Sequence, residues 1–505
     1  MSSRVDASGR AAALLDRLGE GGSFGPCAYT TAWMARLRAP DGTVRFPRAL
    51  DWLTRHQRAD GSWGGEIELP HDRTVCTLAA IVALTDPGPA PPGGEAAVRA
   101  GLAYLRDRSG DWRSAPTGET MGFELAVPLL LDVAFERGLD LPYGDWSELA
   151  KTRQAKLDLI PRERLLAHPT SLMYSLEAVE PDPGLRALAR FSGPDGSLAN
   201  SPSATAALWA ACGSGPALGY LEDLARRFPD GGVPSLYPTE AFELAWALHN
   251  LGRARLLDRR RAAVTRCLDR LRELLGPRGH LGLSGGFPLP DPDDSAMAII
   301  VLRAAGRDVL GLLDGLLAFE GERCFFTYPG ERDGSVTPNA RVLEALALCP
   351  AGYVRPMGKI VDFLLETRRE DAWWYDKWHA SPYYATAQVT SALMSATPLL
   401  LDATSLEPTL SWLLGTRRPD GSWGWYGRGT PEETAYAVLN LDLFARRGAR
   451  VPAPVWSAAY RYLRAHLDGP YPELWVGRSC YTPHDVASSA VLAATVLAAA
   501  HAARR

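Results

Sequence analysis

Three carboxyl side chains occur within four residues, at Asp291, Asp293 and Asp294, with Pro292 between the first two. Carboxylates a few ångströms apart resist full ionisation, so at least one of the three is expected to keep its proton at neutral pH. A protonated carboxyl that is held dry and aimed at one carbon can protonate an alkene, whereas a solvated Asp with a pKa near ~3.9 cannot. The cluster therefore predicts an acid catalyst among these three residues.

Two other interpretations of the cluster remain open. Apolar spacing from Ser295 to Ala304 predicts a helix, so Asp293 or Asp294 could be its N-cap. The dipole of that helix favours the ionised carboxylate, and burial must outweigh this effect. Alternatively, Asp291 and Asp293 could be the acid and base of an α/α-barrel glycoside hydrolase, which requires two carboxyls that face each other across a sugar.

Length and composition indicate a soluble protein with a small-molecule partner. The chain has 505 residues, enough for two large domains, and is 46% hydrophobic and 22% charged. The net charge is −4 and the charges are scattered, which argues against nucleic-acid binding. Seven cysteines without close pairing argue against a disulfide framework and for a reducing compartment, so a cytoplasmic location is predicted.

The ends of the chain predict neither a signal peptide nor a transmembrane segment. Residues 1–22 include Arg4, Arg10 and Asp16, which interrupt any apolar core of a signal peptide. The apolar run 486–500 is too short and too rich in alanine to span a bilayer. Shallow contact with a membrane surface and a homodimer are both left open.

Helical spacing dominates the rest of the chain. Apolar residues recur every three or four positions in 261–275, 339–348, 432–443 and 488–499, with Gly/Pro/Asp clusters between such segments and little strict alternation. The predicted fold class is all-α.

One pentad occurs twice, which predicts a repeated helical architecture. The sequence Asp-Gly-Ser-Trp-Gly stands at 60–64 and again at 420–424, and Asp-Gly-Ser recurs at 195–197. Asp-Gly gives a tight turn, and the Trp after it can lie across a helix end. With Gln57, the first copy resembles a motif of terpene cyclases that start by protonation, whereas the second copy has Arg417 in place of the Gln.

The acidic segment resembles the Asp-x-Asp-Asp-Thr-Ala-Met motif of class II diterpene cyclases, with Ser295 in place of Thr. Further segments resemble the bacterial two-domain members of this family in the same order along nearly the whole chain. These segments are 27–33, 122–124, 200–206, 231–234 and 376–379.

The resemblance implies two α/α barrels, the β and γ domains of terpene cyclases, with the active site in the cleft between them. Residues 1–20 plus 256–505 would form the barrel that carries the acidic motif. Residues 21–255 would form the second barrel, inserted after the first helix. By the same resemblance Asp293 is the acid, flanked by Asp291 and Asp294, and Asn339 hydrogen-bonds the motif. A buried Asn satisfied by backbone is the alternative for Asn339.

The resemblance also implies a diphosphate site that uses Mg²⁺. Glu124 matches a family glutamate that handles Mg²⁺ and diphosphate, and Lys156 matches a diphosphate-binding Lys. Arg478 replaces another such Lys, and Lys377 lies in a matching segment, so both are expected to contact substrate. Considered alone, Glu124 could be a capping residue and Arg478 a surface cation.

A carbocation needs an apolar pocket lined with aromatic faces. Trp378, Tyr384 and Trp423, from two late aromatic clusters, are expected to contribute to it, although most aromatic residues in such clusters are ordinary core. In plant relatives two polar positions remove the final proton, and here these hold Tyr174 and Ser235, which leaves the product skeleton open.

The predicted reaction is cyclisation of geranylgeranyl diphosphate to a bicyclic, labdane-type (copalyl-like) diphosphate. The motif Asp-Asp-x-x-Asp, which marks diphosphate ionisation, is missing from the sequence, so the diphosphate should be retained. Farnesyl diphosphate giving a drimane-type bicycle is the alternative substrate. A non-catalytic prenyl-binding barrel is a third hypothesis, and the longer triterpene cyclases are disfavoured by length.

Overall fold

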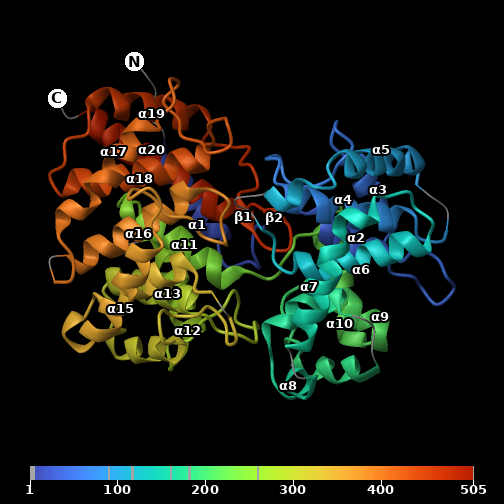
Figure 1. Ribbon diagram of the computed structural model, residues 1–505. Coiled ribbons are helices and arrows are strands. Elements are labelled where there is room, and N and C mark those ends of the chain that lie inside the picture. Colours follow the sequence, from blue (N-terminus) through green and yellow to red (C-terminus); the bar gives the residue numbers. More distant parts are fainter. Residues whose placement is uncertain are drawn as a thin grey trace.

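A computed structural model describes residues 6–88, 91–114, 119–159, 162–179, 183–258, 261–331, 333–397 and 399–503. The described chain folds into two helical lobes with a two-stranded hairpin between them (Figure 1). The strands of that hairpin, β1 (Trp475–Val476) and β2 (Cys480–Tyr481), are the only ones among the described residues. The all-α prediction is confirmed.

One lobe consists of the helices from the first half of the chain. They are α2 (Ala28–Ala35), α3 (Pro47–Arg55), α4 (Pro70–Leu84), α5 (Gly94–Asp107), α6 (Phe123–Glu136), α7 (Ser147–Asp158), α8 (Arg162–Ala167), α9 (Pro202–Cys212) and α10 (Gly215–Arg227), with short 3₁₀ helices between them, including Ser171–Ala178.

The other lobe contains the second half of the chain together with the first helix. Its helices are α1 (Ala7–Arg17), α11 (Glu240–Arg253), α12 (Ala262–Leu275), α13 (Pro292–Ala304), α14 (Val336–Leu346), α15 (Val354–Glu366), α16 (Pro382–Ala396), α17 (Glu407–Gly415), α18 (Pro431–Arg446), α19 (Ala453–Ala465) and α20 (His484–Ala502).

Helix α1 packs against α12 and α20, so both chain ends lie in the same lobe (Figure 1). This is the arrangement that an insertion after the first helix requires. The predicted boundary between residues 255 and 256 is wrong, because α11 packs on α12, α13 and α20, so the inserted lobe ends before Glu240. Helix α20 has the length and apolarity of a membrane span, but two-thirds of its apolar window, 67%, is buried. It packs on α11, α18 and α19 and is the core helix of this lobe.

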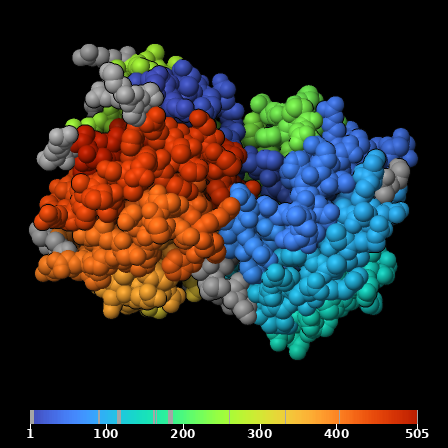
Figure 2. All heavy atoms as spheres, turned by 90° about the horizontal axis from the view of Figure 1, so that it is seen from above, coloured from blue at the N-terminus to red at the C-terminus, as the bar shows by residue number. Residues whose placement is uncertain are grey.

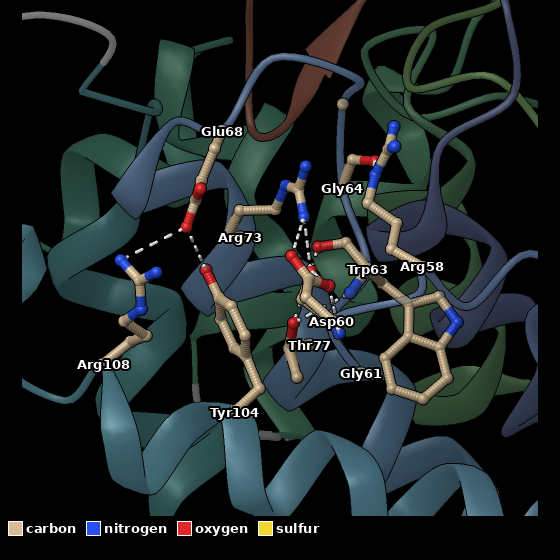
Figure 3. Close-up of polar contacts among 12 residues, drawn as sticks. Arg58, Asp60, Gly61, Trp63, Gly64, Glu68, Arg73, Thr77, Tyr104 and Arg108 are labelled. Atoms are coloured by element: carbon tan, nitrogen blue, oxygen red, sulfur yellow. Dashed lines mark hydrogen bonds and ion pairs between the residues drawn. The ribbon is translucent and has the colours of Figure 1, made fainter.

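The turn at 60–64 shows what the repeated pentad does (Figure 3). The Asp60 carboxylate accepts hydrogen bonds from the backbone N–H and the hydroxyl of Ser62, at 2.9 and 2.7 Å. The indole N–H of Trp63 donates to the Leu53 carbonyl at 2.8 Å, and its backbone N–H donates to the Thr77 hydroxyl at 3.0 Å. The turn thereby fastens the end of one helix to the next helix.

Two further tryptophans make the same pair of bonds, one to a preceding carbonyl and one to a following threonine. They are Trp374 (to Leu364 and Thr386) and Trp423 (to Leu413 and Thr434). The sequence did not reveal the copy at Trp374, because it lacks Asp-Gly-Ser. Its turn is made by Glu370 and Asp371 with φ of 48° and 54°.

The lobes meet along a seam where segments from opposite ends of the chain touch (Figure 2). Arg428 forms an ion pair with Glu66 at 2.6 Å, and the Glu66 backbone N–H donates to Glu473. A single cluster of buried apolar side chains extends from the C-terminal lobe to Met173 and Leu198 of the other lobe. The junction is therefore a packed interface.

Buried Glu243 on α11 anchors the chain segment that follows α1. Its carboxylate accepts from the backbone N–H and the hydroxyl of Ser23, at 2.7 and 2.8 Å. Burial raises the pKa of Glu243 from 4.5 to about 7. As pH rises from about 4.5 to about 7, only the unfolded state ionises freely, so stability is lost through this window.

We expect wild-type stability, measured relative to the Glu243→Gln variant, to fall by up to about 1.4 kcal/mol per pH unit between these values. Urea unfolding of both proteins at a series of pH values measures the difference. A difference that does not change with pH would contradict the prediction.

Candidate active site

Asp291 is the N-cap of α13, and its position fixes the other two acids. Its carboxylate accepts from the Asp294 backbone N–H at 2.8 Å, and its own N–H donates to the Leu281 carbonyl at 2.9 Å. Pro292 occupies the first helical position, which suits its fixed φ. The helix therefore begins at Pro292 and not at Ser295, and the cap is neither Asp293 nor Asp294.

The three carboxyls differ in how firmly they hold a proton. Burial raises the pKa of Asp291 to about 7, and hydrogen bonds from the helix terminus limit the rise. Burial raises the pKa of Asp294 well above its ordinary value, and the charge of Asp291 and a hydrogen bond to it add to this rise. Asp291 is thus the first of this pair to ionise, and Asp294 keeps its proton in a hydrogen bond to it.

Asp293 differs from the other two acids in its exposure. Asp291 and Asp294 are 3% and 2% exposed, whereas Asp293 keeps an intermediate exposure. Its Oδ1, like the Oδ2 of Asp294, is buried and makes no hydrogen bond with a described residue. Burial raises the pKa of Asp293 well above its ordinary value, with Arg341 opposing the rise and Asp291 adding to it. The arrangement is a neutral carboxylic acid that can donate its proton to a ligand.

A group of aromatic side chains clusters around Tyr384, in the same lobe as this acid. The Tyr384 ring stacks on His379 with centroids 4.6 Å apart, and it contacts Trp475 and Tyr436 at 4.8 and 4.9 Å. The Tyr384 hydroxyl accepts from the Trp246 indole at 3.0 Å. Asp293 is among the charges that add to burial in raising the pKa of Tyr384. A wall of this kind supplies the π faces that stabilise a cation.

The opposite lobe contributes an acidic pair and a lysine. Lys156 forms an ion pair with Glu124 at 2.8 Å. Burial raises the pKa of Glu124, but the hydrogen bond and charge of Lys156 outweigh it and give a net lowering. The Glu119 carboxyl hydrogen-bonds that of Glu124. The nearby Met121 backbone N–H donates to the Gly477 carbonyl at 2.7 Å, which places this group beside the hairpin.

This pair fits the magnesium prediction. Mg²⁺ in phosphate-binding sites uses one or two carboxylates and completes its shell with phosphate oxygens and water. Glu119 and Glu124 supply two carboxylates. The described part of the chain contains no cluster of three or more His, Cys, Asp or Glu side chains suited to a metal, so the protein would not hold Mg²⁺ in a cage of its own. The residue Ile160, which follows Lys156 in the family pattern, lies outside the described residues.

Tyr174 and Ser235 both present unused hydroxyls. Each oxygen is buried and makes no hydrogen bond within the described chain. Burial raises the pKa of Tyr174 to about 12, against the opposing charge of Arg478. Unused buried hydroxyls suit a place where a water or ligand is held.

Two tyrosines connect the acidic motif with Tyr174 in the other lobe. Burial raises the pKa of Tyr328, and both Asp291 and Tyr174 are among the groups that add to the rise. The pKa of Tyr481 is raised by burial and then by Tyr174, Tyr384 and Asp294. Groups from both lobes therefore lie within electrostatic range of one another. Sequence reasoning missed both tyrosines, because neither lies in a segment with a recognised motif.

Similarity to known proteins agrees with this geometry. The squalene-hopene cyclase C-terminal domain family matches residues 333–445. Over 500 residues the chain is 32% identical to a type B diterpene cyclase of Mycobacterium tuberculosis, covering 95% of this chain and 97% of that protein. The chain belongs to the class II diterpene cyclases.

Solved structures are similar over the same length. An ent-copalyl diphosphate synthase from Streptomyces platensis has a TM-score of 0.81 and 33% identity, covering 98% of this cyclase and 99% of that chain. The ent-copalyl diphosphate synthase from Arabidopsis thaliana has a TM-score of 0.73 and 25% identity, and the match spans 97% of this cyclase and 62% of that chain.

The geometry does not suit a glycoside hydrolase. Such enzymes need carboxyls that face each other across a sugar, at ~5 to 10 Å. In the cyclase Asp291 and Asp294 hydrogen-bond each other, and Asp293 shares the same helical turn.

Asn339 requires a correction. Both amide hydrogens are used, in bonds of 2.8 Å to the carbonyls of Phe325 and Ser335, and the amide oxygen accepts from the Phe325 N–H. The side chain therefore braces backbone and has no hydrogen left to donate to the acidic motif.

The charged residue beside the acid is instead Arg341, which the sequence analysis missed. It is 1% exposed, is held by Gln388 and forms an ion pair with Glu344 at 3.2 Å. The sequence feature that could have pointed to Arg341 is the presence of an arginine at a core-facing position of an apolar helix.

Trp423 is fully buried, and both of its N–H groups bind neighbouring helices. It supports the fold of the cyclase in the same way as Trp63, and its predicted contact with substrate stays a prediction.

Trp378 is half-buried, with its indole donating to Ser335 at 3.0 Å and its ring 6.5 Å from that of Tyr328. Lys377 lies over the Trp378 ring and forms an ion pair with Glu331 at 3.0 Å. These two residues therefore lie on the side of the acidic motif where Tyr328 is found.

Proposed function

We propose that this class II cyclase converts geranylgeranyl diphosphate into a bicyclic, copalyl-type diphosphate, with Asp293 as the acid. The observation that carries the proposal is that Asp293 combines a buried, unpartnered oxygen and a raised pKa with the partial exposure that Asp291 and Asp294 lack. In the first step its O–H bond breaks and the proton bonds to a terminal alkene carbon, which leaves a tertiary carbocation. The internal alkenes then attack in turn and close two rings.

The surroundings of Asp293 support both the acid and the cation. Once the proton has left, the positive end of the α13 dipole and the charge of Arg341 stabilise the new carboxylate, which strengthens the acid. The rings around Tyr384 offer π faces to the carbocation and exclude water. Closure between two packed lobes keeps the intermediate dry.

The diphosphate is retained in this scheme and needs only to be held. Lys156, with Glu124 and Glu119, forms the group suited to it. Bound Mg²⁺ would neutralise diphosphate charge there, and the two glutamates are the residues that would hold it. The C20 substrate length is supported by the Arabidopsis relative, whose structure contains a geranylgeranyl thiolodiphosphate analogue.

Incubation of the purified protein with geranylgeranyl or farnesyl diphosphate and Mg²⁺, followed by dephosphorylation and gas chromatography–mass spectrometry, tests the proposal. We expect a bicyclic C20 alcohol as the main product and a lower kcat/KM for farnesyl diphosphate. A drimane-type C15 alcohol formed at the higher kcat/KM would assign the shorter substrate. Only uncyclised alcohols from both substrates would overturn the proposal.

A further inference from the structure

Arg478 lies at the tip of the hairpin, in the turn between β1 and β2, and enters the opposite lobe. It is 3% exposed, and its guanidinium donates to the carboxylate of Glu177 and, at 3.0 Å, to the hydroxyl of Ser175. Its central carbon is 4.2 Å from the ring centroid of Tyr174. Tyr174, Ser175 and Glu177 thus all contact the Arg478 guanidinium.

Glu177 is held through one of its two oxygens, Oε1, while Oε2 is buried without a partner in the described chain. The carboxylate accepts from the hydroxyl of Tyr29 at 3.1 Å and from the hydroxyl of Ser203 at 2.9 Å. The pair therefore connects the hairpin with α2, α9 and the 3₁₀ helix Ser171–Ala178. Because Arg478 already has a buried counter-ion, a diphosphate would have to displace Glu177 in order to bind it.

The position of the Tyr174 hydroxyl depends on this arrangement. It lies beside the Gly477–Arg478 peptide, and a Cβ at Gly477 would be 3.2 Å from the phenol oxygen. The ring is thus confined by the guanidinium on its face and by the hairpin turn at its hydroxyl. The phenol oxygen has no side-chain partner in the described chain, although the Arg478 backbone N–H lies close enough to lower its pKa. Tyr481 lies within electrostatic range of both Tyr174 and Asp294.

We propose that the Glu177–Arg478 pair is a positioning device that holds the Tyr174 phenol where the last carbocation loses its proton. The inference rests on the proposed function. Pairing matters because a lone guanidinium would repel the carbocation, whereas Glu177 cancels its charge and leaves a rigid, neutral support. Arg478 thereby acts through Tyr174 and does not anchor the diphosphate.

The terminating step has two outcomes that differ in product. In deprotonation, a C–H bond beside the cationic carbon breaks and its electron pair forms the new C=C bond. The proton passes to the Tyr174 oxygen or to a water held by it, and then to solvent. In water capture, a water oxygen bonds to the cationic carbon and releases a proton, which gives an alcohol. A misplaced phenol should change the ratio of the two.

The test compares Glu177→Gln, Arg478→Lys and Tyr174→Phe with wild type, using the assay for bicyclic products. Each variant should shift the ratio of alcohol to alkene, or of alkene isomers, by roughly 10-fold, while KM for the prenyl diphosphate changes little. The double variant Tyr174→Phe/Glu177→Gln should give the product ratio of Tyr174→Phe alone, because Glu177 acts through that phenol.

The controls separate positioning from loss of stability. Asp442→Asn removes an equally buried carboxylate, 2% exposed and paired with His501, at the far end of α18. It should lower the melting temperature without changing the product ratio. If Glu177→Gln fails to fold, Tyr29→Phe removes only one donor to Glu177 and should shift the products in the same direction, to a smaller extent.

A large rise in KM with unchanged products in Arg478→Lys would overturn the inference and identify a diphosphate anchor. Unchanged products and KM in all three single variants would overturn it as well. Failure of the proposed function looks different, because the wild-type protein would then give no bicyclic product at all.

Discussion

Replacement of Asp293 by Asn should abolish cyclisation, lowering kcat by at least ~10³-fold for whichever prenyl diphosphate is accepted. The amide has nearly the shape of the acid but cannot protonate an alkene. The variant should fold normally, because the Asp293 Oδ1 makes no hydrogen bond that would be lost. Single-turnover assays with mass spectrometry of the dephosphorylated products measure the residual rate.

Asp294→Asn is the matched control. Its amide can still donate to Asp291, as protonated Asp294 does, so the loss of rate should be much smaller than for Asp293→Asn. Wild-type kcat/KM should also fall at alkaline pH, because Asp293 loses its proton once the pH exceeds its raised pKa and can then no longer act as an acid. A bicyclic product from Asp293→Asn at near wild-type rate would remove Asp293 from the mechanism.

Replacement of Trp423 by Ala should reduce the free energy of unfolding by about 3 to 5 kcal/mol. The side chain is fully buried, and the change removes its indole bond to Leu413 and leaves a cavity between helices. Because both N–H groups of Trp423 hold neighbouring helices, we expect its role to lie in the fold, so kcat/KM per folded molecule should stay close to wild type. Urea unfolding and active-site-normalised kinetics below the melting temperature measure the two quantities.

Trp378→Ala is the control with the opposite pattern. Trp378 is only half-buried and lies beside Tyr328. Compared with Trp423→Ala, the change should therefore lower the free energy of unfolding less and kcat/KM more. The assignment of Trp423 as a structural residue would fail if Trp423→Ala kept its stability and lost activity.

Features that depend on short spacing could be predicted from the chain alone. Three carboxyls within one turn predict a retained proton whatever the fold, and the 3.6-residue periodicity predicts helices such as α12 and α18. The repeated pentad indicated a recurring turn, because Asp-Gly-Ser closes it with bonds between residues two apart. The resemblance over nearly the whole length correctly indicated the cyclase family.

Which groups meet, and how each is used, could be read only from the packed molecule. It assigned Asp291 to the helix cap, Asn339 to the backbone and Trp423 to the core, and it brought buried Arg341 beside Asp293. Glu177 and Arg478 are 301 residues apart, and no local pattern in the chain could pair them. The physical reason is that burial and partners set a side chain's charge and reach, and both arise only when distant segments pack together.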